Sequence, residues 1–305
     1  MGGKSGKGDR SLVFIHMLML LCALLVSTSF TVGKSIAAGL DPVVLTLVRF
    51  FIATLLLGPY VKKFHGLHFS WNMILRCSVI SCTLVVFFWC MFLSLRFTSA
   101  LNTSTIFTLV PSIAGFYAMI LVGERLTVPK IIALFCGMVG AVLVIFRGDI
   151  GAFLAMEWNK GDVIFLAGCF AMGLYTPLVR LLHRGEPMVV MTFWILVTGT
   201  IWLFLAAGYK LPHVQWSSVE PVIWLGVSYL ALFTTVISFF LTQYSIPYIG
   251  PTRVMAYSYL YPALVLLLDI VLGNGWPGVG VLPGVFVVMA AMFVIQYSAS
   301  NALPK

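Results

Sequence analysis

The segment from Ser99 to Arg125 is long and apolar enough to cross a lipid bilayer, and a second copy of it begins near Gly250. It reads SALNTSTIFTLVPSIAGFYAMILVGER, and about 20 mostly apolar residues suffice to span the hydrocarbon core. A shift of 151 positions aligns several residues of the two copies: Leu109 with Leu260, Pro111 with Pro262, Leu121 with Leu272, Val128 with Val279, Phe135 with Phe286 and Met138 with Met289. These matches indicate an internal repeat.

The repeat extends upstream with an offset of 145 positions. At this offset the chain aligns two aromatic-Thr pairs and two acidic-Pro pairs: Phe30-Thr31 with Tyr175-Thr176, and Asp41-Pro42 with Glu186-Pro187. Apolar segments match one another through composition alone, so the aligned prolines and acidic-Pro pairs weigh most. They predict two homologous halves.

Composition places the chain in a membrane. Of its 305 residues, 61% are hydrophobic and 9% are charged, whereas about a quarter of the residues of a soluble domain are charged. We therefore predict an all-α integral membrane protein with ten transmembrane helices. The ten apolar segments are 11–38, 42–60, 71–95, 98–121, 128–147, 160–180, 188–207, 217–241, 248–272 and 277–297.

The distribution of Lys and Arg predicts the orientation of these helices, because cytoplasmic loops carry an excess of both. With the N-terminus inside, eleven basic residues lie on the cytoplasmic side and four on the outer side. The inner set is Lys4, Lys7, Arg10, Lys62, Lys63, Arg76, Arg125, Lys130, Arg180, Arg184 and Lys305, and the outer set is Arg96, Arg147, Lys160 and Lys210. We expect a multi-pass protein of the cell (cytoplasmic or inner) membrane, with both termini in the cytoplasm. The net charge of +9 is attributed to this topology and to contact with anionic lipids, not to nucleic acid.

Each half contains five spans, and an odd number forces the second half to enter the membrane from the opposite side. We predict a basic cytoplasmic tail at 1–10, a first five-helix repeat at 11–148 and a second, inverted five-helix repeat at 160–298. Inverted repeats are typical of secondary transporters, whose substrate site lies near the midplane between the halves.

Sequence motifs for metals, cofactors and nucleotides are missing. The six cysteines all lie in apolar spans, without a CxxC pair or a Cys/His cluster, so neither a disulfide framework nor a zinc site is indicated. The N-terminal MGGKSGKGDR contains Gly-Lys-Ser, but no strand precedes it and its spacing differs from that of a phosphate-binding loop. We expect no cofactor, and we expect energy from a gradient, from exchange or from substrate moving downhill.

The first half contains the run SLRFTSALNTSTIFTLVPSIAGFYAMILVGERLTVPKIIALFCGMVGAVLVIFRG, with small and polar residues, a mid-span proline, Gly-Glu at the inner end and then a Gly-rich span. The second half contains SIPYIGPTRVMAYSYLYPALVLLLDIVLGNGW, in which Asn274-Gly275 replaces the Gly-Glu. Both runs resemble the drug/metabolite transporter superfamily, specifically its EamA type. The resemblance implies a ten-helix carrier that moves small organic metabolites, often amino acids or xenobiotics, outward. It implies no particular substrate.

Three hydroxyl residues of the fourth span, Ser104, Thr108 and Ser112, recur every four residues and so share one face of a helix. They either line a wet cavity or pack between helices, where small Ser and Thr side chains are favoured. Asn102 is larger and harder to bury, which favours a cavity role. We assign Asn102, Thr105 and Thr108 to a predicted substrate cavity.

Pro111 and Pro262 each remove a backbone hydrogen bond and kink the helix, which leaves a carbonyl group free one turn earlier. Such free groups are tolerated in a membrane only inside the protein or beside a cavity. Matched kinks in two inverted halves predict a hinge or a gate, although they also fit simple shape-matching within the bundle.

Aromatic side chains are dense in the second copy. Tyr257, Tyr259 and Tyr261 lie in the ninth span, with Tyr257 and Tyr261 predicted on one helix face, where their hydroxyl groups need partners. Together with aromatic residues of other spans, Tyr257 and Tyr261 predict a pocket that accepts flat or apolar groups by stacking. The other residues are Trp89, Tyr175, Trp194 and Phe240.

Ionisable residues inside the spans are the sharpest signals, because each costs roughly 2.5–3.5 kcal/mol at the bilayer centre on insertion scales. Arg49 lies roughly 10 Å into the second span. There it either binds a substrate carboxylate with its planar fork or pairs with Asp269 as an outer gate. Asp269 is the leading candidate for proton coupling, with Lys34 as its gate partner, although Lys34 can also snorkel. Glu124 is predicted to be structural and to neutralise a nearby base.

These features favour a secondary transporter that works by alternating access through a central cavity. The resemblance implies that it exports small amphipathic solutes, such as amino acids or xenobiotics. An exchanger of phosphorylated or nucleotide-linked sugars is the alternative, but only Lys34 and Arg49 qualify as deep basic residues. A lipid-moving or scaffold protein fits Arg49 poorly. A membrane enzyme needs a general base or a metal-binding constellation. The His, Asp and Glu residues of this sequence are scattered singly, so we expect no catalytic residues. The expected partners are a small-molecule substrate and the lipid bilayer, and the pattern predicts no oligomeric state.

Overall fold

A computed structural model describes residues 5–36, 39–67, 70–94, 97–98, 100–156, 158–271 and 278–297 of the chain. The first half forms α1 (Ser5–Ile36), α2 (Pro42–Phe64), α3 (Trp71–Ser94), α4 (Ala100–Phe107), α5 (Val110–Val122), α6 (Val128–Ile145) and the short α7 (Ile150–Leu154). The second half forms α8 (Lys160–Leu182), α9 (Met188–Ala207), α10 (Pro221–Ala231), α11 (Ser238–Ile249), α12 (Pro251–Ala256), α13 (Tyr261–Val271) and α14 (Leu282–Tyr297). Four 3-10 turns and one π-helical turn complete the helical elements: η1 (Gly208–His213), η2 (Trp216–Ser218), η3 (Leu232–Ile237, the π-helical turn), η4 (Tyr257–Leu260) and η5 (Val279–Val281).

Nine helical stretches of the described part are long and apolar enough to cross a membrane. The remaining predicted span, 248–272, is present as α12, η4 and α13, which follow one another directly but change from α to 3-10 geometry and back. The predicted all-α membrane fold of ten helices in two inverted repeats is therefore confirmed.

Helix starts follow ordinary capping chemistry. Asp41 accepts a hydrogen bond from the backbone N–H of Val43, and Pro42 occupies the first position of α2, where a missing N–H costs nothing. At the start of α8, Asn159 and Asp162 form a reciprocal capping box.

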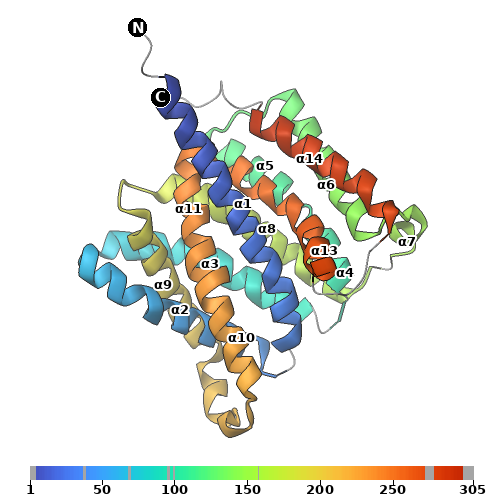
Figure 1. Cartoon of the computed structure of the whole chain (residues 1–305). Coiled ribbons are helices and arrows are strands. Elements are labelled where there is room, and N and C mark those ends of the chain that lie inside the picture. The colour runs from blue at the N-terminus through green and yellow to red at the C-terminus, as the bar shows by residue number, and fades with distance from the viewer. Residues whose placement is uncertain are drawn as a thin grey trace.

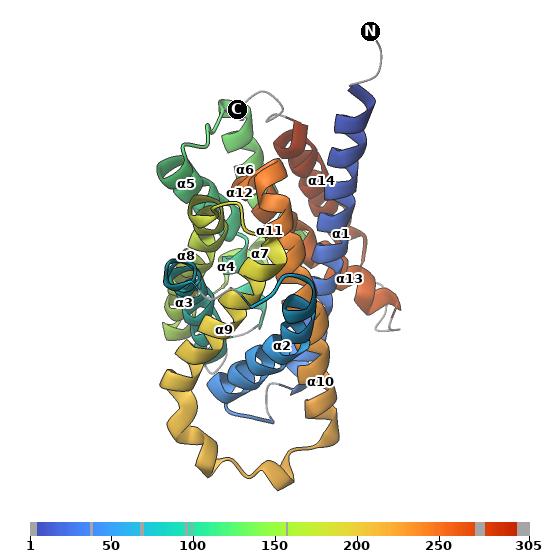
Figure 2. The ribbon, with the colours of Figure 1, turned by 90° about the vertical axis from the view of Figure 1, so that its left-hand side faces the viewer.

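Helix contacts repeat in the two halves, as an inverted repeat requires. Helices α3 and α5 of the first half pack on α8 of the second half. Correspondingly, α11 and α13 of the second half pack on α1 of the first half. Two further pairs, α2 with α9 and α6 with α14, join equivalent helices of the two halves (Figure 1). The pair α6 and α14 forms the right-hand edge of the bundle in Figure 1. Helix α1 packs against α11 and α13, and the turned view shows it along one side of the bundle (Figure 2).

Glycines let α6 and α14 approach at backbone distance. A Cβ atom at Gly140 would lie 2.9 Å from the backbone nitrogen of Val288, and one at Gly284 would lie 2.8 Å from the carbonyl oxygen of Gly140. Close packing of small residues is a main source of helix association in membranes. Gly140 and Gly284 therefore set the spacing of this pair.

The aligned acidic-Pro dipeptides each form an ion pair with the other half. Asp41 pairs with Lys210 at 3.0 Å, and Glu186 pairs with Arg76 at 2.9 Å. Burial alone would raise the pKa of Asp41, but the hydrogen bond and charge of Lys210 lower that pKa below its usual value. The Arg76–Glu186 pair lies at the end of the bundle where α1 begins, which we call the N-terminal end, and Asp41–Lys210 lies at the opposite end.

Both copies of the repeat break just before the aligned proline. The helix α4 ends at Phe107 and α5 begins at Val110, so Pro111 is the second residue of α5. In the second copy η4 interrupts the α-helix, and Pro262 is the second residue of α13. Proline fits the first turn of a helix because the N–H there has no acceptor within the helix. Each predicted kink is thus present as a change of helix geometry.

We expect Gly140→Ala to destabilise the protein by about 1–3 kcal/mol, because its methyl group overpacks the α6–α14 contact. The matched control is Gly33→Ala in α1, where no heavy atom lies within 4 Å of the added Cβ. In a helix that change is expected to stabilise by about 0.5–1 kcal/mol. Denaturant unfolding of both variants in detergent measures the difference. Equal effects would contradict the role of Gly140.

Candidate functional site

Arg49 is buried in α2 with neutral partners. Its side chain is 5% exposed. The Nε atom donates to Thr235 Oγ1 at 2.6 Å, and Nη2 donates to the carbonyl and hydroxyl oxygens of Thr234 at 3.1 and 3.0 Å. The ring of Phe88 lies 5.0 Å from the guanidinium carbon. Within the described part of the chain, Arg49 makes no ion pair, and its Nη1 atom makes no hydrogen bond.

The two threonines belong to η3, the π-helical turn in the eighth span. Both hydroxyls donate to the carbonyl of Leu230 at 2.9 Å, which directs their lone pairs toward Arg49. Single π-helical turns inside α-helices occur frequently at functional sites. Arg49 and η3 belong to different halves, so this contact joins the halves inside the bundle. The sequence signal for it was the adjacent Thr234-Thr235 pair, which we did not single out.

A run of aromatic contacts leads from Arg49 to Tyr175. Phe88 packs on Phe50 with ring centroids 5.8 Å apart, and Phe50 packs on Phe239 at 6.2 Å, both nearly edge-on. The rings of Phe239 and Tyr175 lie 6.0 Å apart. These rings come from α2, α3, α8 and α11, so they form an apolar layer shared by the two halves.

Tyr175 begins a buried polar chain beyond this layer. Gln243 donates from Nε2 to the Tyr175 hydroxyl at 3.0 Å, and its Oε1 accepts from Thr192 at 3.0 Å. All three side chains are buried. The eighth span was predicted to end at 241, and this boundary was wrong, because α11 continues to Ile249. The polar residues that follow position 241 are satisfied inside the bundle, so they do not end the helix.

The described contacts of the second-copy tyrosines reach different helices. The Tyr257 hydroxyl lies 2.6 Å from His16 Nδ1 on α1, whereas the Tyr261 ring stacks on Phe107 of α4 with centroids 6.1 Å apart. The reason is η4, because a 3-10 turn has about three residues per turn. Residues four apart therefore point in different directions at this place.

Hydroxyl groups of the fourth span bond within the protein. Thr108 donates to the carbonyl of Thr105 at 2.7 Å, and Ser112 lies 3.4 Å from the Tyr259 hydroxyl. Tyr259 donates to the carbonyl of Leu134 at 2.8 Å. Ser112 and Tyr259 come from different halves, so this row contributes to packing between them.

The other predicted aromatic residues have different neighbours. Trp89 is 53% exposed on α3, next to Phe88, which faces inward. Trp194 packs on Phe193, and Phe240 packs on Tyr244, with ring centroids 5.4 and 5.7 Å apart. The side chains of four further predicted residues lie outside the described residues: Lys34, Asn102, Ser104 and Asp269.

Glu124 connects the halves at the N-terminal end. It accepts hydrogen bonds from Lys130, which is fully buried, and from the hydroxyl of Thr252 at 3.0 Å. Its predicted structural role fits these contacts. The residue after Thr252, Arg253, is 6% exposed, and its Nε has no hydrogen-bond partner among the described residues. We overlooked Arg253 in the sequence, although it is a basic residue inside the second copy of the repeat.

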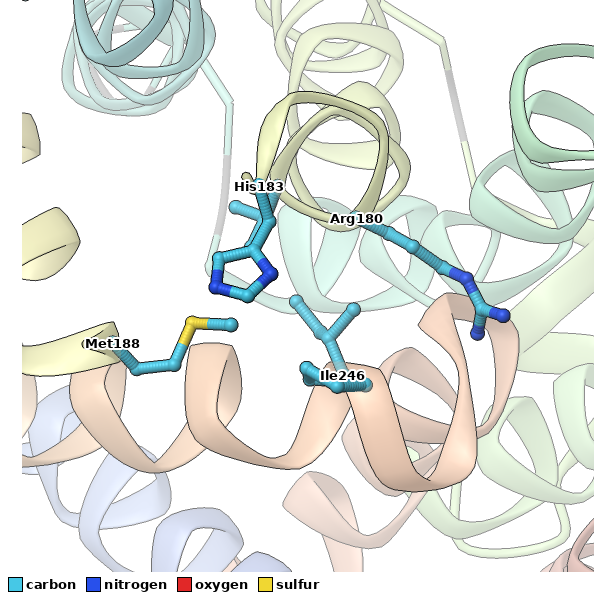
Figure 3. A pocket seen from close by; sticks show the side chains of 6 residues that line it. Arg180, His183, Met188 and Ile246 are labelled. Atoms are coloured by element: carbon cyan, nitrogen blue, oxygen red, sulfur yellow. The ribbon is translucent and has the colours of Figure 1, made fainter. Parts of the chain in front are cut away.

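A pocket of about 170 Å³ opens beside Arg180 at the same end (Figure 3). It lies where α8 and α11 end and α9 begins, and it is lined by Val179, Arg180, His183, Met188, Ile246 and Pro247. His183 Nε2 donates to the carbonyl of Glu186 at 2.9 Å. Among the described side chains, no three His, Cys, Asp or Glu residues gather as metal ligands.

Comparisons with known proteins place this arrangement among transporters. A family model described as the EamA-like transporter family matches residues 13–146 and 159–297. An uncharacterized transporter, YyaM, of Bacillus subtilis (strain 168) is 23% identical over 214 residues, which cover 70% of this chain and 69% of that protein. An uncharacterized transporter of Archaeoglobus fulgidus is 28% identical over 253 residues, 81% of this chain and 85% of that protein. A solved crystal structure that is 19% identical shares the fold, with a TM-score of 0.72 over 94% of this chain and 98% of that chain.

We expect Thr235→Val to destabilise the protein by about 1–3 kcal/mol, because Arg49 Nε then loses its acceptor in a buried place. The control is Thr54→Val, whose hydroxyl donates within α2 to the carbonyl of Phe50. Unfolding in detergent is measured in wild type and in an Arg49→Met background. The effect of Thr235→Val should shrink in that background, and an undiminished effect would disprove the coupling.

Proposed function

Because the chain belongs to the EamA-like transporter family, we propose that this membrane transporter exports small organic metabolites, such as amino acids or other amphipathic solutes, by alternating access. The observation that carries the proposal is the buried guanidinium of Arg49, which contacts both halves and has only neutral partners in the described part. A charge kept in such a place marks a functional site by default. Its free Nη1 donors suit the carboxylate of a solute.

The moving parts follow from the repeat. We assign residues 11–148 and 160–298 to the two alternating halves and residues 1–10 to a cytoplasmic tail, with the N-terminal end of the bundle in the cytoplasm. The positive-inside distribution of Lys and Arg supports this orientation. Pro111 and Pro262 act as hinges, since each follows a break in its helix. Lys34 and Asp269 are assigned to the outer gate or to proton coupling.

The remaining cavity residues are assigned by position. Asn102, Thr105 and Thr108 from the first copy and Tyr257 and Tyr261 from the second belong to broken helices that meet between the halves. We place Tyr175 and Trp194 along the solute path and leave out the predicted Trp89, because it is 53% exposed on α3. No catalytic role is proposed, in keeping with the transporter names of the relatives.

Exchange of phosphorylated or nucleotide-linked sugars is the second candidate function. Such substrates require several deep basic residues, and the structure adds Arg253 and Lys130 to the buried set. Lys130 is neutralised by Glu124, whereas Arg253 forms no ion pair within the described part. This observation supports an anionic solute without specifying a sugar.

We expect Arg49→Gln to reduce transport of carboxylate-bearing solutes by about ten- to hundredfold, because the solute loses one charge-assisted hydrogen bond. The measurement is uptake of radiolabelled amino acids, sugar phosphates and organic cations into proteoliposomes, with and without a pH gradient. Arg184→Gln, at an exposed arginine, is the matched control. Asp269→Asn is assayed in parallel, and an unchanged pH dependence removes Asp269 from coupling.

Organic cations that move equally well in wild type and in Arg49→Gln would remove Arg49 from solute binding. Absence of flux for every solute of the panel, in protein that remains folded, would contradict the proposed transport function.

We expect Pro111→Ala and Pro262→Ala to lower the transport rate several-fold and to leave equilibrium solute binding unchanged, because a continuous helix resists bending. Pro59→Ala, which removes a proline inside α2, is the control. Transport by the two hinge variants at the wild-type rate would contradict the hinge assignment.

A further inference from the structure

Positive charge is in excess where the halves meet at the N-terminal end. Around the turn at Gly250 lie Arg180, Lys130 and Arg253, and Glu124 is the acidic group among them. Arg180 Nη1 lies 3.4 Å from the point that a Cβ atom of Gly250 would occupy, and both carboxylate oxygens of Glu124 lie 3.7 Å from the same point. The four groups therefore form one cluster.

Both carboxylate oxygens of Glu124 already accept hydrogen bonds within this cluster. One carboxylate oxygen accepts from Lys130, and the other accepts from the hydroxyl of Thr252 at 3.0 Å. Within the described part of the chain, Arg180 and Arg253 have neither an ion pair nor a hydrogen bond through their guanidinium groups. Three basic side chains therefore share one carboxylate, and the cluster carries two more positive than negative charges.

A buried guanidinium without hydrogen bonds is costly, because its hydration is lost and nothing replaces it. Arg253 is 6% exposed, and its Nε is fully enclosed without a partner. Guanidinium groups bind carboxylates and phosphates through two parallel N–H donors. An anion between the halves would satisfy donors that the protein leaves empty.

The neighbouring pocket has room for the rest of a small ligand. Its volume of about 170 Å³ is close to that of an engineered cavity of roughly 150 Å³ that holds benzene. Val179, Met188 and Ile246 give it apolar walls, and the Arg180 side chain runs from this pocket toward the Gly250 turn (Figure 3). One solute can thus place an apolar part in the pocket and an acidic part at Arg180.

We propose that Arg180 and Arg253 form a binding site for the carboxylate or phosphate group of a small organic anion, and that the adjacent pocket receives its apolar part. As a recognition site for a transported solute, it rests on the proposed function and narrows the solute class to organic anions. As a binding site, it is tested by equilibrium binding alone, so its failure is distinct from a failure of transport.

The experiment is calorimetric titration of the full chain in nanodiscs of neutral phosphatidylcholine. The probes are phenyl phosphate, phenylacetate and the neutral phenylacetamide. We expect both anions to bind and phenylacetamide to bind at least about tenfold more weakly, since it lacks the charge-assisted bonds. Arg180→Gln and Arg253→Gln should each weaken anion binding by about tenfold or more, and Arg184→Gln should leave it unchanged.

The partly exposed Arg180 keeps the test decisive if Arg253→Gln fails to fold. Anions that bind no tighter than phenylacetamide, or that bind both Gln variants as tightly as wild type, would overturn the proposal. Nanodiscs that contain phosphatidylglycerol distinguish the source of the anion. If phosphatidylglycerol weakens the binding of phenyl phosphate to the wild type but not to Arg180→Gln, the result would support the site and identify a lipid headgroup as its occupant.

Discussion

The hydrogen bonds from Arg49 to the π-helical turn η3 join the two halves inside the bundle. A bilayer offers no donors or acceptors, so a charge inside it must be satisfied by the protein itself. Here the partners are two threonine hydroxyls and one carbonyl of the opposite half, with the face of Phe88 alongside. Any relative movement of the halves must keep these bonds, exchange them or replace them with bonds to a solute. This constraint links the proposed solute site at Arg49 to the proposed movement of the two halves.

The two halves share a backbone plan but differ in their charged side chains. The acidic-Pro dipeptides form equivalent ion pairs at opposite ends of the bundle, and the aligned prolines follow equivalent breaks. At the same offsets, however, Arg49 aligns with Trp194, and Arg253 aligns with Asn102. Symmetry in the backbone allows the halves to exchange conformations, whereas chemical recognition requires groups that are present once. The buried arginines therefore occupy the positions at which the repeat is broken.

The polar and aromatic groups between α8 and α11 connect the two basic regions. The pocket at the N-terminal end lies one helical turn from the chain of Tyr175, Gln243 and Thr192, and the aromatic layer separates this chain from Arg49 along the same helices. These neutral hydrogen-bonding groups therefore lie between the two proposed anion-binding regions. Weak neutral contacts between two proposed anion sites favour movement of a solute, because transport needs sites that also release their ligand.

The sequence by itself determined the membrane environment, the ten spans, the repeat and the places where helices break. These depend on composition, on periodicity and on proline, all of which act over a few residues of chain. It also singled out Arg49, because a charge in an apolar span is visible without a structure. Only the tertiary structure decided what each polar side chain bonds to. Thr108 bonds to Thr105 of its own span, and Gln243 lies in a helix that continues past the expected end of its span. Tyr257 contacts His16 of α1, whereas Tyr261 stacks on Phe107 of α4. Partners such as Arg49 and Thr235 are 186 residues apart in the chain, and no local pattern encodes contacts at that separation.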